Sequence, residues 1–120
     1  MLNIKKLIYK ILHLPLVIEE GSSGNWTYRK WSDGTAECWG RVSKTLSGNS
    51  VDTATYVNYP FAFTAPPIAI VSTSAGGANS YLARQLSDGS DASRLRLFFA
   101  NTYSGETTIY AHAYVIGRWK

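Results

Sequence analysis

Two stretches, one in the middle of the chain and one near its end, decide the fold. Residues 59–71 read YPFAFTAPPIAIV, and residues 107–119 read TTIYAHAYVIGRW. In the first stretch, Pro66-Pro67 keeps the backbone extended and lacks two amide donors, so it belongs immediately before a strand. The apolar run that follows predicts this strand over Ile68–Ser74. In the second stretch, small aliphatic residues alternate with aromatic and polar ones, which predicts a long strand over Thr107–Arg118.

The rest of the chain from residue 25 onward repeats this pattern of strands and turns. No helical period is sustained there, and Gly, Asn, Asp and Ser separate the strand-like runs. The remaining strands are expected at Trp26–Trp31, Thr35–Val42, Thr53–Tyr59, Tyr81–Leu86 and Arg94–Asn101. Short strands joined by polar turns predict an all-β fold, an antiparallel β-sandwich of about six to seven strands.

The first hairpin turns at Ser32-Asp33-Gly34 and has two possible registers. A three-residue loop with Gly34 in the left-handed region sets Arg29 opposite Glu37. A two-residue Asp-Gly loop sets Lys30 opposite Glu37 instead. Both registers place a base across from the acid, so the sequence supports the hairpin and leaves its register open.

Alternation divides the last strand into two faces. The face expected in the core is small and aliphatic: Ile109, Ala111, Ala113 and Val115. The other face carries larger groups: Tyr110, His112, Tyr114 and Ile116. This second face is too aromatic to be left entirely in water, which predicts a contact between subunits there.

The first 15 residues differ in kind from the rest of the chain. Ile4, Leu7 and Ile11 repeat at spacings of three and four, which predicts an amphipathic helix that Pro15 ends. A lone helix of about 14 residues is marginal in water, so its apolar stripe needs a partner. Three alternatives stay open: a short trimeric coiled coil, a helix docked on its own domain or another protein, and a signal peptide or membrane-surface helix.

The domain organisation follows from these segments. We expect an N-terminal helix for oligomerisation or docking over residues 1–15, a linker over 16–24 and the β-sandwich over 25–120. Within the linker, Glu19–Gly24 has the composition of a hinge.

Composition excludes several classes of function. Of the twelve basic residues three lie in the leader, which leaves nine against eight acidic residues and no footprint for nucleic acid. Cys38 is the only cysteine, so neither an intrachain disulfide nor a cysteine-based zinc site is expected, and a packed apolar role fits it best. No apolar run approaches the roughly 18 residues that span a bilayer, so we expect no membrane insertion.

The sequence lacks the motifs of common enzymes. It has no Gly-rich phosphate loop followed by lysine, no Gly-x-Ser-x-Gly and no His-Glu-x-x-His, and its two histidines are His13 and His112. Asp88 and Asp91 have a spacing that matches no calcium loop, which favours a solvated turn. We therefore expect no catalytic residues, no bound metal and no cofactor.

Aromatic and polar side chains outside the core suit the recognition of a sugar. A ring covers the apolar face of a sugar, while arginine, asparagine and carboxylates bond its hydroxyls. The candidate ligand-binding residues are Arg84, Tyr81, Asn101, Tyr103 and Glu106. The alternative is an ordinary surface arginine and a plain hairpin turn at 101–106.

Three features together resemble the C-terminal domain of bacteriophage and prophage tail-fibre proteins: the Trp-rich hairpin Trp26–Gly40, the Pro-Pro strand and the terminal Ile116-Gly117-Arg118-Trp119. The resemblance covers about Gly21 to Lys120. This family is similar in fold to the H-type lectins, which form trimers and bind N-acetylgalactosamine or galactose near subunit boundaries. The resemblance implies a receptor-binding fibre tip in the virion, produced in the bacterial cytoplasm, and not an enzyme.

The implied partners are two further copies of the chain, other tail-fibre proteins and a host cell-surface carbohydrate. The sugar-binding arginine of the lectins corresponds best to Arg84, and their polar and aromatic loop to Tyr103–Glu106. The resemblance therefore implies a shallow pocket near a subunit boundary, where Arg84 meets the 101–106 loop and Tyr103 or Tyr81 stacks on the glycan. The interface is expected at Tyr110, His112 and Tyr114, together with Ile4, Leu7 and Ile11 of the leader. The Trp-His pair of the lectin loop is absent, so the resemblance does not name the sugar. The alternative function is a structural trimerisation or capping module of a fibre without ligand binding.

Overall fold

A computed structural model of the chain describes residues 3–12, 14–74 and 81–120. Met1, Leu2 and His13 of the expected leader therefore lie outside the described residues. Within the described residues, one helix precedes eight strands: α1 (Ile4–Leu12), β1 (Val17–Ser23), β2 (Trp26–Trp31), β3 (Thr35–Leu46), β4 (Ser50–Asn58), β5 (Ile68–Ser74), β6 (Tyr81–Leu86), β7 (Arg94–Asn101) and β8 (Thr107–Arg118).

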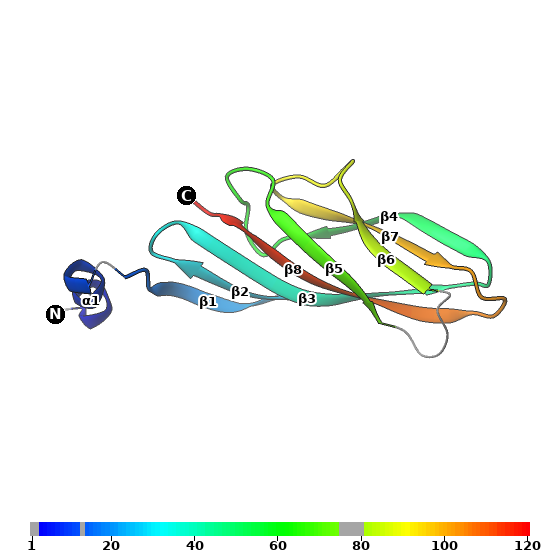
Figure 1. Cartoon of the computed structure of the whole chain (residues 1–120), viewed down its shortest axis with the longest axis horizontal. Helices are drawn as coiled ribbons and strands as arrows, with labels where there is room; N and C mark the ends of the chain where they lie inside the picture. The colour runs from blue at the N-terminus through cyan, green and yellow to red at the C-terminus, as the bar shows by residue number, and fades with distance from the viewer. Residues whose placement is uncertain (1–2, 13, 75–80) are drawn as a thin grey trace.

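The strands form two antiparallel sheets, which confirms the all-β sandwich. Sheet A has the order β1-β2-β3-β8-β5, and sheet B has the order β4-β7-β6. The 12-residue strands β3 and β8 pair from Thr35↔Arg118 to Leu46↔Thr107 and run along much of the molecule, while sheet B covers the half of sheet A that lies farther from α1 (Figure 1). Thr73 joins the edge strands β5 and β6, because its Oγ1 accepts the N–H of Ala83 at 2.8 Å and donates to the Ala83 carbonyl at 3.1 Å.

Most strand predictions are confirmed, and the main correction concerns the expected linker. β2, β5, β6, β7 and β8 have the predicted bounds, whereas β3 extends to Leu46 and β4 begins earlier, at Ser50. The hinge expected over Glu19–Gly24 is wrong, since most of it belongs to β1, an additional edge strand paired with β2. An edge strand is held by backbone hydrogen bonds to one neighbour and tolerates polar side chains, so its sequence does not reveal it.

The first hairpin has the three-residue loop, with Arg29 opposite Glu37. Gly34 has φ 95° and its N–H donates to the Trp31 carbonyl at 3.1 Å. The Asp33 carboxylate accepts the N–H of Thr35 at 2.9 Å, and this bond lowers the pKa of Asp33 below its usual value. The two-residue alternative is therefore wrong, because glycine at position 34 supplies the left-handed residue that the longer loop requires.

The core lies between the sheets and contains the predicted face of β8. Its fully buried members include Leu95, Leu97, Phe99, Ile109, Ala111 and Val115. Cys38 packs among them, and burial raises the pKa of its thiol to about 12, so the thiol stays protonated at neutral pH. The loop after β4 closes one end with Tyr59 and Phe63, whose rings meet edge to face at 5.2 Å.

The molecule is elongated, with α1 at one end (Figure 1). Its principal extents are 62 × 26 × 20 Å and its radius of gyration is 17.7 Å. A compact chain of this length has a radius of gyration of about 14 Å. The apolar stripe of α1 faces solvent, with Ile4 and Ile11 each about two-thirds exposed (66% and 64%) and Leu7 partly covered at 36%. Within the part of the chain that the structure describes, no helical segment combines the length and apolarity needed to cross a membrane.

Candidate ligand-binding surface

Three of the predicted site residues gather at the end of sheet B. Tyr81 pairs directly with Asn101 across β6 and β7. The ring of Tyr103 meets that of Tyr81 edge to face with 6.4 Å between centroids, and the Tyr103 N–H donates to Asn101 Oδ1 at 3.0 Å. Glu106 is exposed on the same loop. The structure therefore places Tyr81, Asn101 and Tyr103 together at this end of the sandwich.

The side chain of Asn101 forms its hydrogen bonds with backbone groups of the chain itself, not with solvent. Its residue is 1% exposed, and its Nδ2 donates to the carbonyls of Leu46, Ser47 and Gly105 at 3.3, 3.1 and 2.9 Å. With Oδ1 bonded to Tyr103, both ends of the amide have partners inside the chain. We therefore interpret Asn101 as a residue that positions the loops, not one that contacts a ligand.

Arg84 is separated from this cluster by the pleat of β6. Ala83 is buried against the core, and Tyr81, two residues earlier, packs against the same core. Because side chains alternate along a strand, Arg84 points to the opposite face, roughly 10 Å along β6 from Tyr81. The pocket expected between Arg84 and the 101–106 loop is not formed by this arrangement.

Arg84 instead belongs to the outer surface of sheet B. Arg84 pairs with Phe98, and Tyr56 pairs with Arg96. The guanidinium carbons of Arg84 and Arg94 lie 4.8 and 4.4 Å from the ring centroids of Phe98 and Tyr56, and that of Arg96 lies 5.6 Å from Tyr56. We call this set the arginine–aromatic face: Tyr56, Arg84, Arg94, Arg96 and Phe98. Four of these residues were not found by the sequence analysis: Arg94, Arg96, Phe98 and Tyr56. The alternation of arginine with leucine in residues 94–97 was the available signal for an outward basic face.

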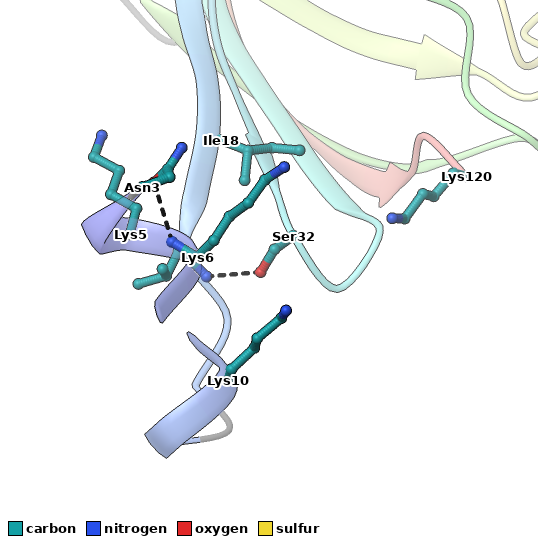
Figure 2. A pocket seen from close by; sticks show the side chains of 8 residues that line it. Asn3, Lys5, Lys6, Lys10, Ile18, Ser32 and Lys120 are labelled. Carbon is teal, nitrogen blue, oxygen red and sulfur yellow. Dashed lines mark hydrogen bonds between the residues drawn. The ribbon is translucent and has the colours of Figure 1, made fainter. Parts of the chain in front are cut away.

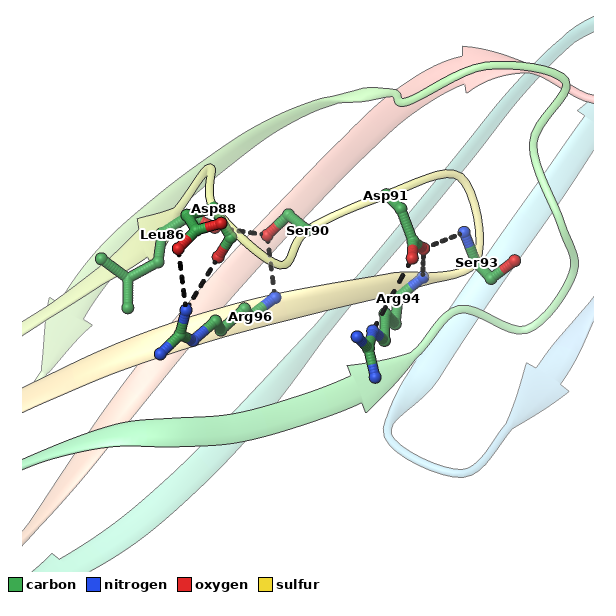
Figure 3. A network of polar contacts seen from close by, with 7 residues as sticks. All are labelled: Leu86, Asp88, Ser90, Asp91, Ser93, Arg94 and Arg96. Carbon is green, nitrogen blue, oxygen red and sulfur yellow. Dashed lines mark hydrogen bonds and ion pairs between the residues drawn. The ribbon is translucent and has the colours of Figure 1, made fainter.

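The loop from Ser87 to Ser93 holds two of these arginines in place (Figure 3). Arg96 Nε donates to the Thr53 carbonyl at 2.7 Å, and its Nη1 donates to the Asp88 carbonyl at 3.1 Å. Asp91 Oδ1 accepts the N–H groups of Ser93 and Arg94 at 2.8 and 2.9 Å. The two aspartates thus belong to an ordered turn. Among the described residues, no group of three His, Cys, Asp or Glu side chains is placed to hold a metal ion.

The outward surface of sheet A carries the predicted interface residues of the last strand. Ile70 pairs with Tyr114, Ile68 with Ile116, and Ser72 with His112. Ile68 and Ile70 are 68% and 64% exposed, so β5 adds apolar area that the sequence analysis had not assigned to an interface. We call this set the open face: Ile68, Ile70, Tyr110, His112, Tyr114 and Ile116.

A polar cluster borders the open face. Arg29 Nη2 lies 2.9 Å from Glu37 Oε1, and the Tyr114 hydroxyl donates to the other oxygen of Glu37. That hydrogen bond raises the pKa of the Tyr114 hydroxyl above its usual value. Arg29 also lies over the Trp39 ring at 4.9 Å, beside a hollow of about 240 Å³. Glu37 is 8% exposed, and its two carboxylate oxygens are already bound by Arg29 and Tyr114 of the same subunit.

A larger hollow of about 440 Å³ lies between α1 and the tip of sheet A (Figure 2). Lys5, Lys6 and Lys10 of α1 approach it together with Lys120, over a floor that includes Leu16 and Ile18. All four lysines are exposed. This end of the molecule is therefore basic, and the Lys120 ammonium lies over the Trp119 ring at 5.0 Å.

No family model matches the sequence, and no curated protein matches it. Solved structures do match. The C-terminal part of the P. aeruginosa R1 pyocin fibre is 14% identical, with a TM-score of 0.69 over 98% of this chain and 32% of that one. The chain has the fold of these pyocin fibre domains. An N-truncated R1-type pyocin tail fibre is 12% identical, with a TM-score of 0.67 over 98% of both chains. The C-terminal part of the R2 pyocin fibre is 14% identical, with a TM-score of 0.52 over 95% of this chain and 29% of that one.

At these identities the likeness concerns the fold. This chain spans about one third of the longer R1 pyocin fibre chain and nearly all of the truncated R1-type fibre. The arginine–aromatic face and the open face are therefore argued from this chain's own residues.

Proposed function

We propose that the chain is a receptor-binding domain of a tail fibre, a component of a phage or phage-tail-like particle that recognises a host cell-surface glycan. The observation that carries the proposal is the arginine–aromatic face, on a fold shared with pyocin fibre domains. Guanidinium groups bond sugar hydroxyls and the rings offer apolar surface, which together suit a hydroxyl-rich ligand. The face is a sheet surface, so each site is shallow.

We further propose that the domain acts as a homotrimer through its open face and the stripe of α1. The exposure of Ile68 and Ile70 beside Tyr114 supports this, because one apolar surface on every copy is buried at once in a closed ring. Ile4, Leu7 and Ile11 would meet their counterparts in the same assembly. Three copies also raise the strength of attachment to a cell, since weak sites engage together.

The sedimentation mass of the chain tests the trimer. We expect the parent to sediment as a species three times 13.2 kDa and Ile70→Lys to dissociate it, because a lysine at a buried contact would lack a partner. Val51→Lys is the matched control, since Val51 is 62% exposed on sheet B, and it should leave the trimer intact. A parent that stays monomeric at all concentrations would contradict the proposal.

Glycan binding by the purified chain tests the recognition proposal. On an array of bacterial surface glycans, Arg84→Ala should weaken the signal at least about tenfold, because a central arginine of a binding surface is a typical hot spot and three copies multiply its loss. Lys5→Ala removes the same charge at an exposed position of α1, outside the arginine–aromatic face, and should bind like the parent. Thermal melting of both variants should match the parent. Equal binding by Arg84→Ala would place the site elsewhere, with Tyr103→Ala as the next variant to examine.

The second candidate function is a structural trimerisation or capping module. The apolar open face and the exposed helix stripe favour it, because assembly alone accounts for both. Intact trimers that bind no surface glycan on the array would support this module over the receptor-binding domain.

A further inference from the structure

We infer that the arginine–aromatic face takes an acidic saccharide, one that carries a carboxylate or a phosphate ester. This inference rests on the proposed glycan recognition and specifies the chemistry of its ligand.

The three guanidinium groups of this face lie on neighbouring strands within reach of one ligand. Arg84 is directly opposite Phe98, and Arg96 is two residues from Phe98 on the same side of β7. Such diagonal neighbours are about 7–8 Å apart in a sheet. Arg94 follows two residues farther along β7. A single acidic sugar unit with its neighbour in a chain therefore spans the set.

These arginines are already oriented before any ligand arrives. Arg84 and Arg94 lie over aromatic rings at 4.8 and 4.4 Å, and two backbone carbonyls hold Arg96 at 2.7 and 3.1 Å. The backbone also closes over Arg96 at Gly89, where a Cβ would lie 2.8 Å from Arg96 Cδ and the φ of +87° favours glycine. Stacking on a ring leaves the N–H edge of a guanidinium free, and a fixed side chain loses little entropy on binding.

The acids near the face do not neutralise it. The carboxylates of Asp88 and Asp91 lie 3.6 and 3.7 Å from Arg96 and Arg94, beyond the 2.7–2.9 Å typical of a charge-assisted hydrogen bond. Both are solvated, and the Asp88 side chain is 100% exposed, so these pairs are weak. Arg84 has no ion pair within 4.0 Å in residues 3–12, 14–74 and 81–120.

An oxyanion therefore matches this face better than a neutral sugar does. A carboxylate or phosphate accepts two parallel, charge-assisted N–H bonds from one guanidinium. The hydroxyl groups of a neutral sugar form weaker hydrogen bonds with the same guanidinium. The rings of Tyr56 and Phe98 then cover the apolar side of the pyranose. Nucleic acid fits less well, because outside the leader the chain has nine basic and eight acidic residues and no broad basic surface.

Immobilised polymers that display one sugar at equal density test the inference with the full chain. The probes are glucuronate, glucose 6-phosphate and glucose, with polyglutamate and duplex DNA as non-saccharide anions. We expect at least one acidic sugar polymer to bind at least tenfold more tightly than the glucose polymer, and the two acidic arms identify which anion is preferred. Binding should weaken as salt rises from 50 to 500 mM.

Variants connect the binding to the face. Arg84→Ala should remove most of the preference for acidic sugars and Arg84→Lys should restore only part of it, because lysine cannot bind bidentately. Lys5→Ala, at an exposed position of α1, should keep the preference. Glucose bound as tightly as the acidic sugars, polyglutamate or DNA bound equally well, an Arg84→Ala variant with unchanged preference, or no binding to any sugar polymer would each overturn the inference. Glucose binding that depends on Arg84 would overturn the acidic class alone and leave the proposed glycan recognition standing, whereas the cell-glycan array tests that recognition independently.

Discussion

Asn101→Ala is expected to lower the free energy of unfolding by about 2–4 kcal/mol, because four backbone groups, one in a buried and three in part-buried hydrogen bonds, would lose their partner at once. The Asn101 amide donates to the carbonyls of Leu46, Ser47 and Gly105 and accepts the N–H of Tyr103. These groups belong to two segments, so the amide at the end of β7 connects the end of β3 and the residue after it to the 101–106 loop. Urea unfolding at one fixed protein concentration measures the change.

Two comparisons make the Asn101 result specific. Asn58→Ala removes an exposed amide and should change stability by less than about 0.5 kcal/mol. Asn101→Asp keeps the size but removes the donor, so it should destabilise at least as much as alanine does. An Asn101→Ala variant as stable as the Asn58 control would show that water replaces the amide and that our interpretation of its role is wrong.

Gly40→Ala is the second substitution with a large expected effect, about 1–3 kcal/mol of lost stability. A Cβ at position 40 would lie 2.0 Å from the Asn25 carbonyl oxygen and 3.0 Å from its carbon. Both are backbone atoms at the start of β2, where Trp26 pairs with Gly40, so the strand itself would have to move.

A drop in melting temperature and in the urea midpoint measures the Gly40 effect. Ser43→Ala, at an exposed position of the same strand, is the control and should melt like the parent. Unchanged melting of Gly40→Ala would show that the start of β2 shifts without cost and would contradict the close packing described above.

Local chemistry in the sequence determined most of the fold. The two-residue period of the last strand identified Ile109, Ala111 and Val115 as core, and the structure buries all three. Pro66-Pro67 marked the start of β5, and Gly34 marked the first hairpin. These features depend on a residue and its near neighbours, so they are legible without knowledge of the partner strands.

The residues that share the candidate surface could not be predicted from the sequence, because they are brought together by contacts between strands that are distant along the chain. Tyr81 and Tyr103, both candidate residues, lie together at one end of sheet B. The lectin resemblance grouped Arg84 with the 101–106 loop, whereas the pleat turns it to the other side, toward Phe98 of β7. Asn101 was expected to face a ligand because an amide can bond sugar hydroxyls, but it is buried and donates to three carbonyls of the chain itself.

By itself, then, the sequence determined where β2, β3 and β5 to β8 begin, which face of β8 is apolar and that the common catalytic motifs are absent. Only the tertiary structure decided that residues 17–23 form a strand, that Glu37 faces Arg29, and that Arg84, Arg94 and Arg96 share one surface. The physical reason is the same in each case. Strand pairing is a choice among distant partners made by backbone hydrogen bonds, and the side chains that become neighbours are set by that choice rather than by their spacing along the chain.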